Sequence, residues 1–190
     1  RNPDLGVEAI RNTLRSTGSN VSGYRKVNGA AAARAVARAK PTVHGAIATY
    51  YNAHGGAAAM GAPTTWELST GVGGVVQTFT KNGRATSIYW SHETGAHRVE
   101  TWKGIGTRYS RLGGPAAFGL PAKDELPTST AGAYQNFVRP GTTQTTKIIW
   151  SAATGAQPVV ETSAIGKQWA RDGHEAGSGY PTSPEVKTAA

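Results

Sequence analysis

Two histidines and a glutamate lie close together in the segment IYWSHETGAHRV, at positions 88–99. Zinc proteases place two histidines four residues apart on a helix, with a glutamate directly after the first. His92 and His97 are instead five residues apart, which puts them about 140° apart around a helix and on opposite faces of a strand. This spacing excludes a shared metal ion, and the sequence predicts neither a metal site nor a cofactor.

Three glutamates, Glu67, Glu125 and Glu185, each follow a Gly-x-Pro turn in similar segments. Sugar hydrolysis needs two carboxyl groups about 5 to 10 Å apart, whereas each segment offers a single glutamate. A carboxylate after such a turn can accept backbone N–H groups, and Gln77 or Gln135 can complete the bond within its own segment. We therefore expect a structural role for Glu67, Gln77, Glu125 and Gln135. No Gly-x-Ser-x-Gly elbow occurs either, so the sequence predicts a protein that is not an enzyme.

Aromatic side chains are the better candidates for binding. Tyr89 and Trp90 are neighbours on an expected strand, so their side chains point to opposite faces and one of them should face away from the core. A flat ring can cover the C–H face of a sugar while polar side chains bond its hydroxyl groups. The candidate glycan-binding residues are Tyr89, Trp90, His97, Arg98, Arg139, Trp150 and Gln157. Trp90 and Trp150 fit a second reading equally, as the large core residue of each unit.

A comparison of the sequence with itself reveals an internal repeat. Nine residues recur 58 positions later: Ile47, Tyr51, Gly55, Gly56, Gly61, Pro63, Glu67, Gln77 and Phe79. Beyond residue 139 the offset is 60, so that Trp90 corresponds to Trp150. A partial third copy begins near Ile165. The repeat domain is accordingly 44–190, divided into a first repeat at 44–101, a second at 102–161 and a partial third at 162–190.

Each copy predicts the same order of elements. Apolar residues at helical spacing in 45–56 and 102–114 indicate a helix of two to three turns that ends at paired glycines. A Gly-x-Pro turn follows, then a strand, a hairpin and a return strand. The hairpin turn is Asn82-Gly83 in the first copy and the longer segment 139–144 in the second. The predicted fold class is therefore an α+β repeat.

The first 43 residues do not fit this unit and form a basic, helical segment or linker. Helices are expected within 2–18 and 29–40, and eight of the twenty Lys and Arg residues lie here, against Asp4 and Glu8. This positive charge suits either a solvated helix face or contact with an anionic polymer. Basic residues are not interleaved with aromatic ones, and no nucleic-acid motif occurs, so nucleic acid is not expected as a partner. No apolar run reaches the roughly 18 residues that would predict insertion into a membrane.

The repeat domain resembles the LGFP repeat family. The resemblance rests on GGAAAMGAPTTWE, LGGPAAFGLPAKDE and GSGYPTSPE, together with the Trp-Ser and Thr-Gly-Ala elements that recur in order. The LGFP tetrapeptide itself is only approximated, by MGAP and FGLP. The resemblance implies a propeller-like arrangement of units, each with a short helix and a small β-hairpin. The ring would be closed by residues 1–43, by further copies of the chain as a homo-oligomer, or by a part of the protein outside this sequence.

The resemblance also implies a function. LGFP repeats are envelope-associated, secreted modules of mycolate-containing actinobacteria and their phages, often appended to mycoloyltransferases or peptidoglycan-cleaving enzymes. The expected function is therefore a noncatalytic module that binds cell-wall polysaccharide, with arabinogalactan as the leading candidate, and that anchors its carrier outside the cell. The alternative is an accessory region of a wall hydrolase or mycoloyltransferase whose catalytic domain lies elsewhere.

Overall fold

The computed structural model describes residues 7–22, 24–38 and 40–186. The chain forms two compact units, Arg1–Thr42 and Val43–Ala190. In the first unit, two antiparallel strands, β1 (Ser19–Val21) and β2 (Tyr24–Lys26), connect the helices α1 (Val7–Thr17) and α2 (Gly29–Arg38). The two expected helices are present here, and the small hairpin between them has no counterpart in the sequence-based expectation.

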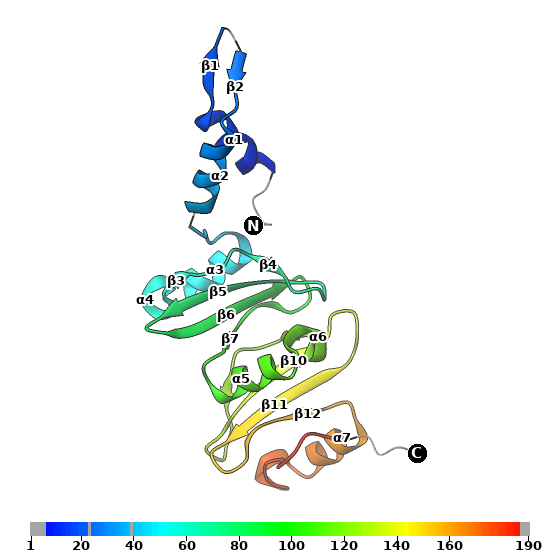
Figure 1. The fold of residues 1–190 in the computed structure, drawn as a ribbon. Helices are drawn as coiled ribbons and strands as arrows, with labels where there is room; N and C mark the ends of the chain where they lie inside the picture. Colours follow the sequence, from blue (N-terminus) through cyan, green and yellow to red (C-terminus); the bar gives the residue numbers. More distant parts are fainter. Residues whose placement is uncertain (1–6, 23, 39, 187–190) are drawn as a thin grey trace. The chain divides into compact units, whose positions relative to one another are not determined.

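The first repeat contains two helices followed by a five-stranded antiparallel sheet (Figure 1). Its elements are α3 (Gly45–Ala53), α4 (Gly56–Met60), β3 (Ala62–Pro63), β4 (Leu68–Ser69), β5 (Val75–Lys81), β6 (Arg84–Ser91) and β7 (Gly95–Glu100). Strands β5, β6 and β7 form the body of the sheet, and β3 and β4 both pair with the outer edge of β5. Asn82 and Gly83 both have positive φ values, of 50° and 76°, as the two-residue hairpin between β5 and β6 requires.

The second repeat has the same elements in the same order. They are α5 (Gly104–Arg111), α6 (Gly114–Phe118), β8 (Leu120–Pro121), β9 (Leu126–Pro127), β10 (Ala133–Val138), β11 (Thr145–Ser151) and β12 (Gly155–Val160). The third, partial repeat provides α7 (Ala164–Arg171) and the 3₁₀ turn His174–Ala176. The internal repeat and the α+β character of its unit are confirmed. A third long strand, β7 or β12, completes each sheet and was not predicted.

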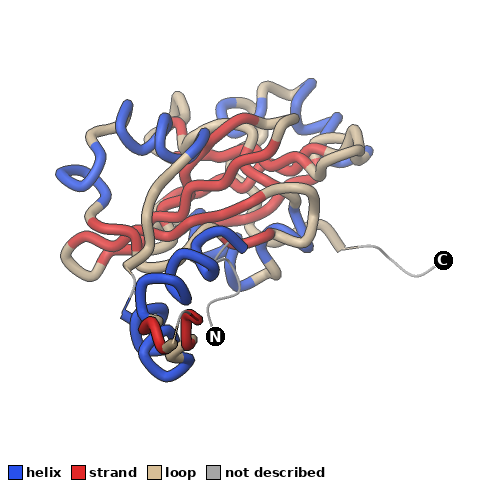
Figure 2. Tube along the Cα trace, turned by 90° about the horizontal axis from the view of Figure 1, so that it is seen from above, coloured by secondary structure: helices blue, strands red, loops and turns tan. Residues whose placement is uncertain are grey.

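Helices and sheets alternate as layers along the repeat domain, and each sheet is covered on both faces (Figure 1). One core lies between α3 and the first sheet and contains Ile47, Tyr51, Met60, Phe79 and Ile88. The other lies between the two sheets and contains Tyr89, Val99, Ile105, Tyr109, Leu120, Phe137 and Ile148. From above, the strands cross the middle of the domain with helices around them (Figure 2). Each buried apolar side chain stabilises the fold by about 1.5–3 kcal/mol.

One aromatic hydrogen bond recurs in all three repeats. The hydroxyl groups of Tyr51 and Tyr109 each donate to the carbonyl oxygen of the glycine ten residues later, Gly61 and Gly119, at 2.7 Å. In the third repeat the indole Nε1 of Trp169 donates to the carbonyl of Gly179 at 3.1 Å. These bonds fix the helix of each unit to the turn that starts its sheet.

The paired glycines adopt the left-handed conformation expected of them, with φ values of 87° and 51° at Gly55 and Gly56. They do not end the helical region, however, because a second short helix follows at once in both complete repeats. The described residues form stacked layers and no closed ring, so the propeller-like arrangement stays a prediction.

Candidate functional site

A small pocket occurs at the same place in both complete repeats, with a volume of about 210 Å³ in each. The Trp90 pocket, in the first repeat, is lined by His44, Gly45, Ala46, Ile47, Glu67, Val75 and Trp90. The Trp150 pocket, in the second, is lined by Lys103, Gly104, Ile105, Glu125, Ala133 and Trp150. Isoleucine, glutamate and tryptophan therefore recur at matched positions, and the pocket is a property of the repeat.

The tryptophan of each pocket also belongs to a core. Trp90 and Trp150 are partly exposed, and each packs against the cluster of buried residues beneath its own helix. In the second repeat the indole lies so close to α5 that a Cβ at position 104 would be 2.5 Å from its Cδ1 atom, and this position is a glycine. One part of each ring therefore packs in the core and another part lines the pocket, while stacking of a sugar on either ring stays a prediction.

The glutamate of each pocket pairs with the residue that precedes the helix. Glu67 Oε2 lies 3.7 Å from His44 Nδ1, and Glu125 Oε1 lies 3.1 Å from Lys103 Nζ. Burial lowers the pKa of Lys103, but hydrogen bonds and charge from Glu100 and Glu125 outweigh it, so the pKa lies above its ordinary value. Each pocket therefore combines an indole face, a carboxylate and a basic group.

Buried glutamines hold the segments that carry these glutamates. Gln77 Nε2 donates to the carbonyl of Thr65 at 3.0 Å, and Gln135 Nε2 donates to the carbonyl of Lys123 at 2.8 Å, in each case two residues before the glutamate. The sequence predicts that the glutamates accept backbone N–H groups. In the structure they face a pocket and a basic side chain instead, while the glutamines make the bond to the backbone.

Glu100 and Glu125 both contact Lys103 Nζ, so two carboxylates lie near the Trp150 pocket. A glycosidase also brings two carboxyl groups together, but one of them must be a protonated acid. Here both carboxylates instead contact one ammonium group, and together these groups supply acceptors and donors for hydroxyl groups.

Tyr89 requires a correction. Its side chain is only 8% exposed, and its ring packs edge-on against Tyr109 with the centroids 5.9 Å apart. Burial raises its pKa to about 12. Strand alternation does separate Tyr89 from Trp90, but both faces of the sheet are covered, so each residue enters a different core. Tyr89 has no face open to a sugar.

His97 and Gln157 occupy equivalent positions, away from both tryptophan pockets. His97 Nε2 lies 3.0 Å from the carbonyl oxygen of Thr94, and Gln157 Nε2 donates to the carbonyl of Thr154 at 3.2 Å. The other polar atom of Gln157 accepts from Arg108 at 3.2 Å. Polar atoms that the protein already bonds are less available to a ligand.

Asp124 of the second repeat connects residues of the first. Its carboxylate accepts from the Tyr50 hydroxyl and, at 3.1 Å, from the backbone N–H of Arg98, and lies 3.4 Å from His97 Nδ1. Burial raises the pKa of Asp124, but bonds from His97 and Tyr50 outweigh it and lower the pKa to about 2. No local pattern in the sequence indicates this junction, because the partners of Asp124 lie 26 to 74 residues away.

The two remaining arginines lie apart from the tryptophan pockets. The guanidinium of Arg139 donates to the carbonyl of Ala117 at 3.1 Å, at the end of α6. Lys81, its counterpart in the first repeat, donates to the carbonyl of Ala58. Arg98 lines a separate, larger cavity. The structure therefore places only Trp90 and Trp150 of the seven candidate residues in the repeated pocket.

Within residues 7–22, 24–38 and 40–186, no three His, Cys, Asp or Glu side chains gather as a metal ion would need. In the same part of the chain, no helix combines the length and apolar character needed to span a bilayer.

The repeated fold and its repeated pocket define a tandem-repeat module. The LGFP repeat model matches residues 60–116 and 118–177, which is more than half of the chain, and the chain belongs to the LGFP repeat family. Each matched segment starts at the strands of one unit and ends in the helices of the next. A comparison with curated proteins finds no match.

Proposed function

We propose that the repeat domain is a noncatalytic module that binds cell-wall polysaccharide and anchors its carrier to the outside of the cell envelope. Membership of a cell-wall-associated repeat family supports this proposal. The observation that carries it is the pocket of tryptophan and glutamate that recurs in both complete repeats. An indole covers the C–H face of a sugar ring, and the glutamate and the adjacent basic residue bond its hydroxyl groups.

Repetition suits a repetitive polymer such as arabinogalactan. A single shallow pocket binds a sugar with a dissociation constant in the range of about 1 μM to 1 mM. Two linked pockets on one polymer raise the overall affinity by a factor of about 10² to 10⁴. A weak contact in each repeat thereby becomes firm retention at the wall.

Sedimentation with purified arabinogalactan and with walls of mycolate-bearing bacteria tests the proposal. The double variant Trp90→Ala/Trp150→Ala is expected to lose about tenfold or more of the apparent affinity. Tyr24→Ala is the matched aromatic control, because Tyr24 is 82% exposed and lies in the N-terminal unit. Because both tryptophans also pack in cores, Glu67→Gln/Glu125→Gln provides a second test that leaves the apolar packing intact.

Unchanged wall binding by both double variants, with native circular dichroism, would refute the proposed site. Release of soluble sugar or peptide from the walls by the wild-type chain would refute the noncatalytic role.

The proposal extends to a ring of units completed by further copies of the chain. Ile165 supports this extension, because it is 58% exposed whereas its counterparts Ile47 and Ile105 are 1% and 2% exposed. Ile47 and Ile105 pack in cores with strands of their own repeats, and strands supplied by another copy of the chain would cover Ile165 in the same way. Light scattering on the purified chain tests the extension, and a monomer at all accessible concentrations contradicts it.

A further inference from the structure

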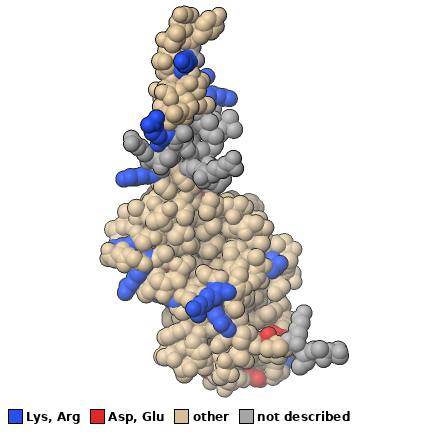
Figure 3. All heavy atoms as spheres, in the orientation of Figure 1, with Lys and Arg blue, Asp and Glu red and all other residues tan. Residues whose placement is uncertain are grey.

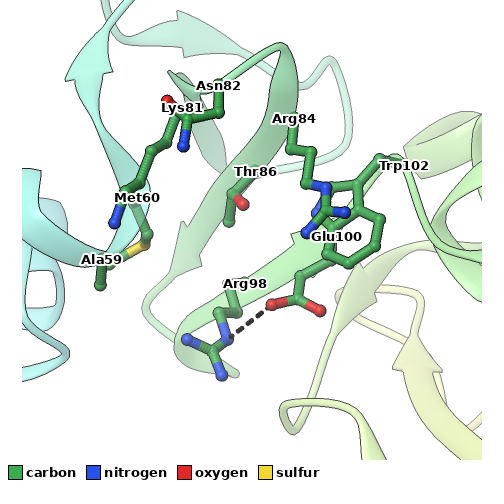
Figure 4. A pocket seen from close by; sticks show the side chains of 9 residues that line it. All are labelled: Ala59, Met60, Lys81, Asn82, Arg84, Thr86, Arg98, Glu100 and Trp102. Atoms are coloured by element: carbon green, nitrogen blue, oxygen red, sulfur yellow. Dashed lines mark ion pairs between the residues drawn. The ribbon is translucent and has the colours of Figure 1, made fainter.

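A cavity of about 490 Å³ lies at the hairpin end of the first sheet (Figure 4). Trp90 lies at the opposite end of β6. It is lined by Ala59, Met60, Lys81, Asn82, Arg84, Thr86, Arg98, Glu100 and Trp102. This volume falls within the range of about 300–1,000 Å³ that is usual for small-ligand sites. None of the family's repeated motifs accounts for its charged residues, so its role needs a separate explanation.

Strand register brings the polar residues of this cavity together. Lys81 pairs with Arg84 across the hairpin turn, and Thr86 pairs with Glu100 on the adjacent strand. Side chains two residues apart on a strand share a face, so Arg84 lies beside Thr86, and Arg98 lies beside Glu100. The side chains of these residues therefore lie on the same face of the sheet.

The charge of the cavity is positive. Three basic side chains line it against the single carboxylate of Glu100, and that carboxylate also contacts Lys103 outside the cavity. Arg98 Nε lies 3.9 Å from Glu100 Oε1, which is an ion pair without a close hydrogen bond. On the face of the repeat domain drawn in Figure 3, Lys and Arg side chains are more widely spread than Asp and Glu.

Trp102 positions one of the cations. The Arg84 guanidinium carbon lies 4.4 Å from the centroid of the Trp102 ring, so the indole holds the guanidinium at the mouth of the cavity. A stacked guanidinium keeps its N–H groups at the ring edge free for a planar anion. The arrangement is therefore prepared for a carboxylate or phosphate group.

The second repeat is an internal control for the role of these residues. The positions equivalent to Arg84, Arg98, Glu100 and Trp102 are occupied there by Gln144, Pro158, Val160 and Thr162. The second repeat nevertheless forms the same helices and the same sheet. Folding of the unit therefore does not require the charged set, which favours a role in recognition.

We propose that this cavity, the Arg84 site, binds the anionic group of an acidic saccharide, a carboxylate or a phosphate, on Arg84, Arg98 and Lys81. Asn82 and Thr86 supply hydrogen bonds to the hydroxyl groups of the sugar. The inference rests on the proposed function, because it adds an acidic component to the wall glycan that the module recognises. It differs from that function in using only the first repeat.

Calorimetric titration with three probes tests the Arg84 site: galacturonic acid, glucose 1-phosphate and neutral galactose. Either acidic probe, or both, is expected to bind with an affinity about tenfold or more above that of galactose. Which of them binds distinguishes the carboxylate from the phosphate. Binding should weaken as NaCl rises from about 50 to about 500 mM, because the site is open to screening by salt.

Variants that copy the second repeat provide the structural control. Arg84→Gln and Trp102→Thr introduce side chains that the equivalent positions already carry, so both are expected to fold. Arg84→Gln should reduce the affinity for the acidic probe about tenfold or more, and Trp102→Thr should reduce it less, since Trp102 acts through Arg84. Arg171→Gln, at an exposed arginine in the last turn of α7, should leave this affinity unchanged.

Equal affinities for the acidic and neutral probes would overturn the inference, and so would an Arg84→Gln variant that binds the acid as the wild type does. The outcome is independent of the wall sedimentation experiment. Loss of acid binding in Arg84→Gln with normal sedimentation supports the Arg84 site. Unchanged sedimentation of the tryptophan double variant would count against the proposed function and would leave the Arg84 site untouched.

Discussion

The first and second repeats have the same core and different surfaces. Phe79 and Phe137, Ile88 and Ile148, and the two pocket tryptophans are retained, and so is the bond from tyrosine to glycine. Arg84, Arg98 and Glu100 of the Arg84 site have no charged counterpart in the second repeat, whereas Lys81 corresponds to Arg139. A second difference lies where units meet, since each junction uses its own residues. The comparison separates what the unit needs to fold from what each copy has added.

The largest expected effect is at Gly106, where a helix touches the preceding sheet. A Cβ at this position would lie 2.3 Å from the carbonyl oxygen of Glu100, and at Gly166 it would lie 2.1 Å from that of Val160. The first repeat has the partly exposed Ala48 here. We expect Gly106→Ala to lower the free energy of unfolding by about 3 kcal/mol or more, because two backbones must separate.

Urea denaturation measures this change, and Ala48→Gly is the reciprocal control. The control should cost only about 1 kcal/mol, the ordinary helix penalty of glycine. Equal effects of the two substitutions would show that the close approach of α5 to β7 does not constrain the fold.

The next largest effect is expected at Asp124, which ties the second repeat to the first. Its place in the third repeat is taken by Pro184, so this tie is unique to one junction. Asp124→Asn should lower the free energy of unfolding by about 1–3 kcal/mol at neutral pH, because the ionised partner of His97 and Tyr50 is lost.

The pH dependence provides the check. The pKa of Asp124 is lowered to about 2 in the folded chain, and an unfolded aspartate has a pKa of about 3.9. The stabilisation is therefore complete above about pH 4 and is lost as the pH falls toward 2. Thermal melts of the wild type and Asp124→Asn should converge in that range, and a difference that persists at pH 2 would contradict the assignment.

A smaller effect is expected at the residue that each unit inserts into the unit before it. Leu120 packs against Gly74 and the apolar Val72, whereas Tyr180 packs against Gly132 and bonds the hydroxyl groups of Thr128 and Thr130 at 2.7 and 2.8 Å. Tyr180→Leu should cost about 1 kcal/mol in thermal or urea unfolding, the net value of the lost hydrogen bonds.

The partner substitution sharpens the same point. Leu120→Tyr should cost about 1–3 kcal/mol, because the larger ring enters a fully packed site. A stable Leu120→Tyr variant would show that the two junctions are interchangeable.

The smallest effect is expected at Arg139, whose bond to the end of α6 is made by Lys81 in the first repeat. Arg139→Lys should change the free energy of unfolding by less than about 0.5 kcal/mol and leave glycan affinity unchanged. Wall binding is measured by sedimentation. A marked loss of binding in this variant would show that Arg139 contacts the glycan.

Local patterns in the sequence predicted most of the unit. The 58-residue offset fixed the number of copies, and the Asn82-Gly83 pair fixed the hairpin, since few dipeptides favour two positive φ values in a row. The paired glycines were placed correctly but did not end the helical region. A left-handed residue only redirects the chain, and α4 follows because apolar residues such as Met60 gain burial by forming another turn.

The candidate site was harder to predict because it depends on contacts between layers. Alternation along β6 correctly separated Tyr89 from Trp90, but it does not tell whether the opposite face of a sheet meets water or another helix. Glu67 and Glu125 recur at the same position of the repeat, which the sequence reveals, but only the structure shows that they face a pocket. Trp102 has no tryptophan counterpart in the second repeat, where Thr162 takes its place. This difference between the copies was the signal in the sequence that pointed to the Arg84 site.

The helices α5 and α6 lie in the single core between the two sheets, where they meet the last face of one sheet and the first face of the next. Nearest-neighbour coupling of this kind makes a repeat array unfold cooperatively, because a unit that unfolds exposes part of the core of its neighbour. The autonomous piece of this domain is consequently a sheet together with the helices on either side of it. A truncation between β7 and α5 cuts through a core, although it falls between two repeats in the sequence.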